Sequence, residues 1–246
     1  MRILLWNIQS GGGERVDRIS AEILNSKADI IALTEFKDNK YGEKLQQDIS
    51  KSYQYKFFNI NLKNIKAKYK KKIDLNSVFV ASKVPLSNEN NIFIANNEER
   101  IISFEVSGIV IYLVYFPQGK LQIPLFEYLF NEIDEKNDKP ILILGDFNSG
   151  NNMFDRQNKN SVKFHCAKFF DNFEKRDYIN IWKELNSYGN EIINNEYSWF
   201  SNRNNGFRID HAFIHKKYIS LIKSCYYEHK PRENKVSDHS IMIIDL

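Results

Sequence analysis

A short apolar run that ends in an acid and an amide is the feature of this chain that most restricts its fold. Residues 141–144 read Ile-Leu-Ile-Leu and stop at Gly145, and Asp146 and Asn148 follow two positions apart. An apolar run of this length, bounded by proline and glycine, predicts a buried strand. Side chains alternate along a strand, so Asp146 and Asn148 point the same way. This strand end is therefore where an α/β enzyme would place its chemistry.

Other apolar runs end in, precede or contain polar groups of the same kind. They are Asn7 after the run 3–6, Glu35 after the run 29–34, Asp210 within the run 208–214, and Asp238 and His239 before the run 242–244. The combined set offers carboxylate, amide and imidazole groups, and it contains no cysteine. Oxygen ligands of this sort suit Mg²⁺ or Mn²⁺ and not a structural zinc. We therefore expect a divalent-cation site built from these groups.

The same residues carry a resemblance to a known family. The chain resembles the endonuclease/exonuclease/phosphatase superfamily, and within it the exonuclease III and abasic-site endonuclease branch. The motifs follow the family's order and extend over nearly the whole chain. They are Trp6-Asn7-Ile8, Thr34-Glu35-Phe36, Tyr115-Phe116-Pro117-Gln118-Gly119, Gly145-Asp146-Phe147-Asn148, Tyr197-Ser198-Trp199-Phe200, Arg208-Ile209-Asp210 and Ser237-Asp238-His239-Ser240. One departure follows Asn148, where the chain lacks the proline usual in abasic-site endonucleases, although Asp155 stands near the position of that loop's final acid.

The pattern of apolar residues predicts many strands with helices between them. We expect strands at 2–8, 28–35, 53–60, 77–82, 91–95, 101–106, 109–115, 140–145, 196–200, 208–215 and 239–245, and helices at 14–25, 41–51, 123–135, 164–175 and 179–186. Two packed sheets with helices outside fit this order. The resemblance implies an α/β fold, a four-layered αββα sandwich of two mixed β-sheets flanked by helices. We expect residues 1–246 to form a single domain, because the motifs at both ends must meet in one site.

The resemblance also implies a role for each residue of the set. Glu35 and Asp238 are the expected carboxylate ligands of Mg²⁺ or Mn²⁺, with Asn7 in support. Mg²⁺ takes one or two protein carboxylates and keeps waters or substrate phosphate for its other positions.

The remaining groups are expected to act on the phosphate itself. His239, paired with Asp210, would be held positive and donate to a phosphate oxygen. Asp210 could instead pair with Arg208. Asp146, beside Asn148, would either position the attacking water or protonate the leaving oxygen, and Tyr115 would contact the scissile phosphate.

Two groups are expected to bind the rest of the substrate. The stretch 61–72 carries six lysines, among them Lys68, Lys70, Lys71 and Lys72. Such a run could contact a nucleic-acid backbone or form a solvated loop. The resemblance implies that the residues just before the Arg208-Ile209-Asp210 motif lie beside the active site, and it makes Phe207 and Trp199 candidates for a pocket wall there, because a nucleotide without its base leaves a space that an apolar group can line. Each could instead be a core residue.

Composition leaves the substrate open. The formal net charge of +4, from 35 basic and 31 acidic residues, permits a nucleic-acid partner. No apolar run approaches the roughly 20 residues that span a bilayer, and no signal peptide is visible. We expect a cytoplasmic monomer, a Mg²⁺-dependent phosphodiesterase that acts on DNA. The alternatives are a phosphodiesterase or phosphatase for RNA, an inositol phosphate or a phospholipid head group, and an inactive nucleic-acid-binding homologue.

Overall fold

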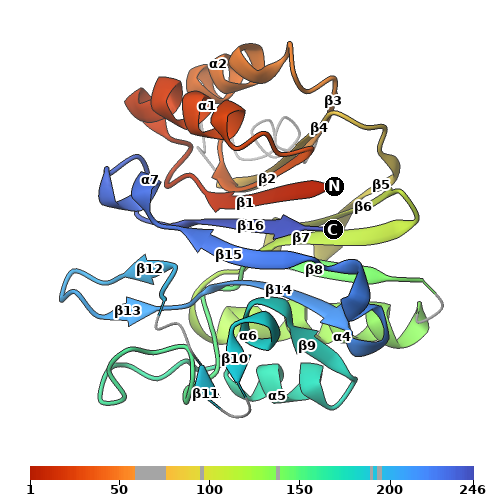
Figure 1. Cartoon of the computed structure of the whole chain (residues 1–246), viewed down its shortest axis with the longest axis vertical. Helices are drawn as coiled ribbons and strands as arrows, with labels where there is room; N and C mark the ends of the chain where they lie inside the picture. Colours follow the sequence, from red (N-terminus) through yellow and green to blue (C-terminus); the bar gives the residue numbers. More distant parts are fainter. Residues whose placement is uncertain (59–75, 95–96, 137–138, 189–190, 193–195) are drawn as a thin grey trace.

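Two six-stranded sheets pack face to face in the computed structural model, which describes residues 1–58, 76–94, 97–136, 139–188, 191–192 and 196–246 (Figure 1). The first sheet has the order β15 (Ser224–Glu228), β16 (Ile241–Asp245), β1 (Arg2–Asn7), β2 (Ile30–Phe36), β4 (Ser77–Ser82) and β3 (Tyr55–Phe58). The second has the order β5 (Ser87–Ile94), β6 (Asn97–Val106), β7 (Ile109–Tyr115), β8 (Ile141–Asp146), β14 (Asp210–His215) and β9 (Tyr178–Asn180). Both sheets are mixed, because β1 runs parallel to β2, and β7 to β8, whereas the other pairs are antiparallel.

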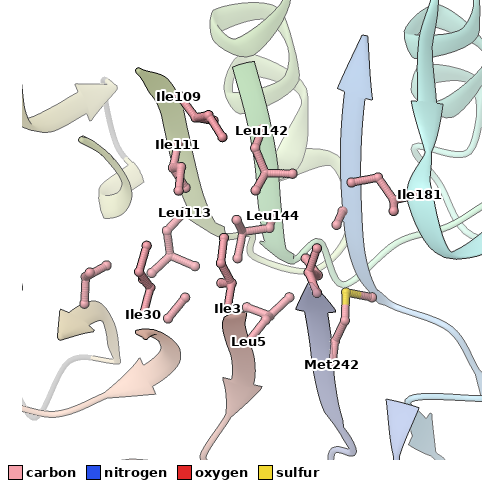
Figure 2. Close-up of a cluster of buried hydrophobic side chains, with 14 of the residues drawn as sticks. Ile3, Leu5, Ile30, Ile109, Ile111, Leu113, Leu142, Leu144, Ile181 and Met242 are labelled. Carbon is pink, nitrogen blue, oxygen red and sulfur yellow. The ribbon is translucent and has the colours of Figure 1, made fainter. Parts of the chain in front are cut away.

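Alternation along the strands builds the core between the sheets. Ile3 and Leu5 of β1 face Leu142 and Leu144 of β8 in one buried cluster, which Figure 2 shows from close by. The intervening residues of β1 pack on the opposite face of the same sheet. Both faces of the central strands are buried, so these strands read as continuous apolar runs.

Helices cover the two outer faces, which gives the four layers visible in Figure 1. Helices α1 (Val16–Asn25) and α2 (Lys40–Ile49) pack on the first sheet, and α4 (Ile123–Glu135) and α5 (Lys168–Glu174) pack on the second. The predicted four-layered α/β sandwich is confirmed. No helix in the described ranges is long and apolar enough to span a bilayer.

Several shorter elements lie at the edges of the sandwich. Helix α6 spans Ile181–Leu185 and α7 spans Lys230–Glu233. Two antiparallel strand pairs, β10–β11 (Ser187–Tyr188, Glu191–Ile192) and the hairpin β12–β13 (Trp199–Phe200, Gly206–Phe207), complete the strands. Short 3₁₀-helical segments occupy Gly13–Arg15, Gly119–Gln122 and Lys216–Leu221.

The predicted helix 179–186 is partly wrong, and β15 was not predicted. Residues 178–180 form β9, because they pair with the edge of β14 before α6 begins. In β15 only Cys225 and Tyr227 are buried, so the alternation offers too few apolar residues to stand out. The predicted strand 196–200 shortens to β12. The lysine run, including Lys68, Lys70, Lys71 and Lys72, lies outside the described residues.

Candidate active site

Four predicted site residues lie at the same end of the two sheets because of strand alternation. Asn7 continues the inward-facing series of β1, Tyr115 that of β7, Asp146 that of β8 and Asp210 that of β14. Asp146 is in register with both Tyr115 and Asp210. These polar side chains take the place of a further layer of apolar core residues, and they lie together at one end of the two sheets.

Glu35 reaches this site through an irregularity in β2. The register with β4 shifts between Thr34 and Phe36, and Glu35 has a left-handed φ of 56°. Regular alternation would send Glu35 to the opposite face from Thr34, so the bulge redirects its side chain. The Asn7 amide then donates to Glu35 Oε1 at 3.1 Å, and the Ser10 backbone N–H donates to Oε2 at 2.6 Å.

A glycine sets the approach of β8 to β7. A Cβ at Gly145 would lie 1.9 Å from the carbonyl oxygen of Val114, and φ is +155°. Only glycine fits this close contact, which keeps Asp146 beside Tyr115. The Tyr115 hydroxyl donates to Glu35 Oε1 at 3.4 Å. Burial and the Glu35 charge raise the pKa of Tyr115 to about 12, so the phenol remains a proton donor at neutral pH.

The buried pair of Asp210 and His239 is formed as the sequence predicts. Asp210 Oδ2 lies 2.8 Å from His239 Nδ1, and both side chains are buried. Burial alone would lower the pKa of His239, but the charge and hydrogen bond of Asp210 raise it to about 10. The imidazole is therefore positive at neutral pH, with Nδ1 donating to the carboxylate.

Asp146 occupies a different electrostatic environment. Its side chain is 1% exposed, Oδ2 accepts a hydrogen bond from the Asn7 amide at 2.8 Å, and Oδ1 accepts one from the Asn148 backbone N–H at 2.8 Å. Burial and the nearby charge of Asp210 raise the pKa of Asp146 to about 7. A carboxyl group with such a pKa can either accept or donate a proton near neutral pH.

The two carboxylate oxygens of Asp238 differ in their hydrogen bonding. Oδ2 accepts a hydrogen bond from the Trp199 indole N–H at 3.0 Å, whereas Oδ1 is buried and has no hydrogen-bond partner within the described part of the chain. A buried carboxylate oxygen without a donor is costly, so a ligand there would be stabilising. A second cluster, Asp146, Asp210 and His239, also has potential ligand atoms within 4.8 Å of one another.

A pocket of about 440 Å³ opens over these groups. The predicted site residues that line it are Glu35, Asn148, Trp199, Phe207, Asp238 and His239. Asn7 and Tyr115 form hydrogen bonds to Glu35, and Asp210 forms one to His239, so these three residues position side chains that line the pocket. The structure therefore brings together every predicted site residue that it describes.

The sequence did not indicate the opposite wall of the pocket. Phe164 and His165 lie in this wall, and the Phe164 ring is 5.8 Å from that of Phe207 in an edge-on contact. The Trp199 ring also lies 5.8 Å from that of Phe207. The loop that holds Phe164 is neither helix nor strand, so no periodic pattern marks it.

The sequence also did not indicate the role of two serines whose hydroxyl groups bond the backbone around the site. Ser198 Oγ accepts hydrogen bonds from the backbone N–H groups of Ile209 and Asp210, at 3.1 and 3.2 Å. Ser237 Oγ donates to the Asn7 carbonyl at 2.6 Å and accepts from the His239 N–H at 3.2 Å. Both serines lie in motifs that the sequence displays, but only the fold shows what they hold.

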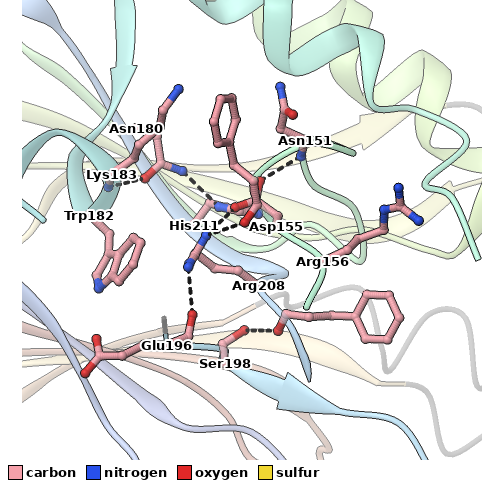
Figure 3. A network of polar contacts seen from close by, with 12 residues as sticks. Asn151, Asp155, Arg156, Asn180, Trp182, Lys183, Glu196, Ser198, Arg208 and His211 are labelled. Carbon is pink, nitrogen blue, oxygen red and sulfur yellow. Dashed lines mark hydrogen bonds and ion pairs between the residues drawn. The ribbon is translucent and has the colours of Figure 1, made fainter. Parts of the chain in front are cut away.

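Arg208 does not pair with Asp210. Its guanidinium donates to Asp155 Oδ1 at 2.7 Å and to the Glu196 carbonyl at 2.7 Å, and it stacks on Trp182 at 3.8 Å (Figure 3). Asp155 also accepts a hydrogen bond from the Asn151 N–H at 2.7 Å. This buried network anchors the start of β14 and leaves Asp210 free to hold His239.

Comparison with protein families gives a match over most of the chain. The sequence model of the Endonuclease/Exonuclease/phosphatase family matches residues 4–239. Comparison with curated protein sequences gave no match.

Three solved structures that share the fold are those of a 3′ phosphatase, an AP endonuclease and a 3′-5′ exonuclease. The 3′ phosphatase NExo from Neisseria, bound to a product DNA hairpin, gives a TM-score of 0.77 at 19% identity, covering 100% of this chain and 99% of that one. An AP endonuclease from Archaeoglobus fulgidus gives 0.78 at 18% identity, covering 99% and 98%. A 3′-5′ exonuclease (NExo) from Neisseria meningitidis gives 0.76 at 19% identity, covering 100% and 99%. At such identities the likeness shows the fold.

Proposed function

Because the chain belongs to the Endonuclease/Exonuclease/phosphatase family, whose members hydrolyse phosphate esters, we propose that it is a Mg²⁺-dependent nuclease that hydrolyses the phosphodiester backbone of DNA. The observation that carries the proposal is the convergence of Glu35, Asp238 and His239 on one pocket with an aromatic wall. Two acids that could hold a cation lie there beside a positive imidazole, which is the charge arrangement that a phosphate group requires.

Glu35 and Asp238 are the proposed cation ligands. Oδ1 of Asp238, buried and without a hydrogen-bond partner among the described residues, and the all-oxygen character of the two acids fit Mg²⁺ or Mn²⁺. Asn7 now directs its amide nitrogen at Glu35 and its oxygen at the Gln9 N–H, 2.8 Å away. Its supporting role is therefore to orient Glu35, and direct ligation would require rotation of the amide. A bound cation would neutralise negative charge on the phosphate oxygens.

The Asp146, Asp210 and His239 cluster is the less suitable metal site. Its imidazole is protonated at neutral pH, and a protonated ring repels a cation. We assign this cluster to proton and charge chemistry. His239 donates from Nε2 to a non-bridging phosphate oxygen, and Asp210 holds the ring in position and keeps it charged.

Asp146, Asn148 and Tyr115 complete the proposed chemistry. With a pKa near 7, Asp146 can take a proton from the attacking water or give one to the leaving oxygen. Asn148 lines the pocket and directs its amide to the Phe116 carbonyl at 2.9 Å, which leaves Oδ1 available to substrate or water. Tyr115 is a neutral donor beside Glu35.

Phe207 and Trp199, with Phe164, form the proposed wall for a sugar that lacks its base. All three line the pocket, and the Phe207 ring lies 5.8 Å from each of the other two. This arrangement favours an abasic-site endonuclease activity. The lysines Lys68, Lys70, Lys71 and Lys72 are proposed backbone contacts on sequence grounds alone.

One substrate panel tests the proposal. It compares abasic-site duplex, undamaged duplex, single-stranded DNA, RNA, DNA with a 3′-phosphate and a soluble organic phosphate, each with Mg²⁺ and with chelator. We expect Mg²⁺-dependent cleavage of DNA, highest on the abasic-site duplex. Turnover of RNA or of the soluble phosphate with no turnover of DNA would overturn the assignment to DNA.

A further inference from the structure

A second pocket, of about 290 Å³, adjoins the active-site pocket. It is lined by Gln9, Phe200, Arg232, Lys235, Ser237 and Asp238. Asp238 lines both pockets, so the two are neighbours. Figure 1 shows α7 at the same end of the molecule as the hairpin β12–β13. The role proposed above for Asp238 does not explain the two cations that line this second pocket.

Arg232 is held in place before any ligand binds. Its Nε donates to Ser240 Oγ at 3.0 Å, and its guanidinium carbon lies 4.4 Å from the Phe200 ring centroid. The side chain is half-buried, and its terminal amino groups have no hydrogen-bond partner among the described residues. A guanidinium that is stacked and tethered in this way loses little freedom on binding an anion.

Lys235 lies on a turn whose carbonyl groups accept hydrogen bonds from two arginines, Arg15 of the 3₁₀ turn before α1 and Arg18 of α1. Arg15 donates to the Val236 carbonyl at 2.6 Å, and Arg18 donates to the Asn234 carbonyl at 2.7 Å. Lys235 has a left-handed φ of 56°, which is unfavourable for lysine, and its own N–H donates to the Arg232 carbonyl at 2.9 Å. The turn thus presents Lys235 beside Arg232 at the cost of backbone strain.

The charge of the pocket suits a singly charged anion. Arg232 and Lys235 contribute two positive charges, whereas Asp238 contributes one negative charge and has Oδ2 engaged by Trp199. Glu233 is exposed and does not line the pocket. Ser237 is already committed to Asn7 and His239 through Oγ. The cations therefore remain available to a phosphodiester.

We propose that the Arg232–Lys235 pocket binds a second phosphodiester of the same nucleic-acid strand, one that flanks the scissile phosphate. The proposal rests on the proposed function and narrows its substrate class to a polynucleotide, because an ester with one phosphate has no second phosphate to place here, and the charge of the pocket suits the single charge of a phosphodiester. Arg232 supplies the directional hydrogen bonds, and Lys235 supplies a point charge.

The test combines enzyme variants with single neutral linkages in the substrate. Each phosphodiester on either side of the cleavage position is replaced, one at a time, by an uncharged methylphosphonate. Wild type, Arg232→Gln and Lys235→Gln are compared with Arg176→Gln, a matched control whose guanidinium also stacks on a phenylalanine, at 4.6 Å, and pairs with Asp134 away from the site. Lys235 is exposed, so its substitution tests the pocket without disturbing packing.

We expect one linkage at which neutralisation lowers wild-type kcat/KM about ten-fold, the effect of one charged hydrogen bond. On the unmodified strand, the kcat/KM of Arg232→Gln should be lower than that of wild type by the same factor. Neutralising that linkage should not lower the kcat/KM of Arg232→Gln further, because both changes remove the same contact. Lys235→Gln should reduce the slope of log affinity against log salt by about 0.7–0.9. Arg176→Gln should behave as wild type.

The proposal is overturned if every neutral linkage affects wild type and Arg232→Gln by equal factors, or if both pocket variants match Arg176→Gln. Such a result with an active wild type leaves the nuclease assignment intact. Failure of the nuclease assignment would instead appear as no cleavage of any unmodified strand by wild type.

Discussion

Replacing Asp210 by Asn should convert His239 from a positive group to one that titrates near neutral pH. The carboxylate lies 2.8 Å from Nδ1, and both side chains are buried. Asparagine keeps the size and one oxygen but removes the charge that raises the pKa of His239 to about 10. Burial lowers the pKa of His239, and without the opposing charge of Asp210 it should return that pKa toward or below the ordinary value of about 6.5.

The size of the effect follows from the fraction of protonated imidazole. At pH 8 a group with a pKa of about 10 is almost fully protonated, whereas one with a pKa of about 6.5 is protonated in about 3% of molecules. Asp210→Asn should therefore lose about thirty-fold in kcat at pH 8. His239→Ala should lose about 10²–10⁴-fold at every pH, since no proton can restore the group. The double variant should be little worse than His239→Ala, because the two residues act as a unit.

The assay is single-turnover cleavage of abasic-site duplex between pH 6 and pH 8, with saturating Mg²⁺. Relative to wild type, Asp210→Asn should gain about twenty-five-fold as the pH falls from 8 to 6. Asp245→Asn is the control, because it removes a carboxylate that pairs with Arg2 at 2.8 Å at the other end of β16. A pH profile of Asp210→Asn parallel to that of wild type, or additive losses in the double variant, would refute the reasoning.

Three other variants have expected outcomes. Asp146→Asn should lower the cleavage rate about 10²–10⁴-fold. In urea unfolding with chelator, the stability of Asp146→Asn relative to wild type should increase as the pH rises from 4 to 8. In wild type the folded-state pKa of Asp146, about 7, lies above the unfolded value, so the stability that proton binding gives to wild type is lost over that range. Phe207→Ala should reduce abasic-site cleavage far more than cleavage of undamaged DNA; equal losses with a large drop in Tm would make Phe207 a core residue. Alanine at all four lysines should weaken DNA binding and reduce the salt slope by up to about 0.9 per lost contact, with little change in single-turnover rate; an unchanged slope would mean a solvated loop at Lys68, Lys70, Lys71 and Lys72.

The sequence predicts the central strands well because they are buried on both faces. The runs at 3–6 and 141–144 are apolar without interruption, and the polar residues that end them stand out. Strand alternation then accounts for Asn7, Asp146 and Asp210 facing inward. The edge elements are harder, since β9 and β15 carry few buried side chains and depend on pairing with their neighbours.

The geometry of Glu35 and of the pocket could not be predicted from pattern. Alternation alone would place Glu35 on the face opposite Thr34, and only the bulge redirects it. Phe164 belongs to an irregular loop, and its contact with Phe207 joins segments distant in sequence. The partner of Arg208 was equally open, because Asp155 and Asp210 are both acids, and the fold alone decides between them.

The most direct test of the central claim is a divalent-cation titration of cleavage by wild type, Glu35→Gln and Asp238→Asn, paired with calorimetric measurement of Mn²⁺ binding. Glu35 and Asp238 line one pocket, and the buried Oδ1 of Asp238 has no protein donor in the described part of the chain. We predict no cleavage by wild type in chelator, recovery with Mg²⁺ or Mn²⁺, and loss of both Mn²⁺ binding and cleavage in the two folded variants. Undiminished cleavage in excess chelator, or normal Mn²⁺ binding and turnover by Glu35→Gln, would contradict the account.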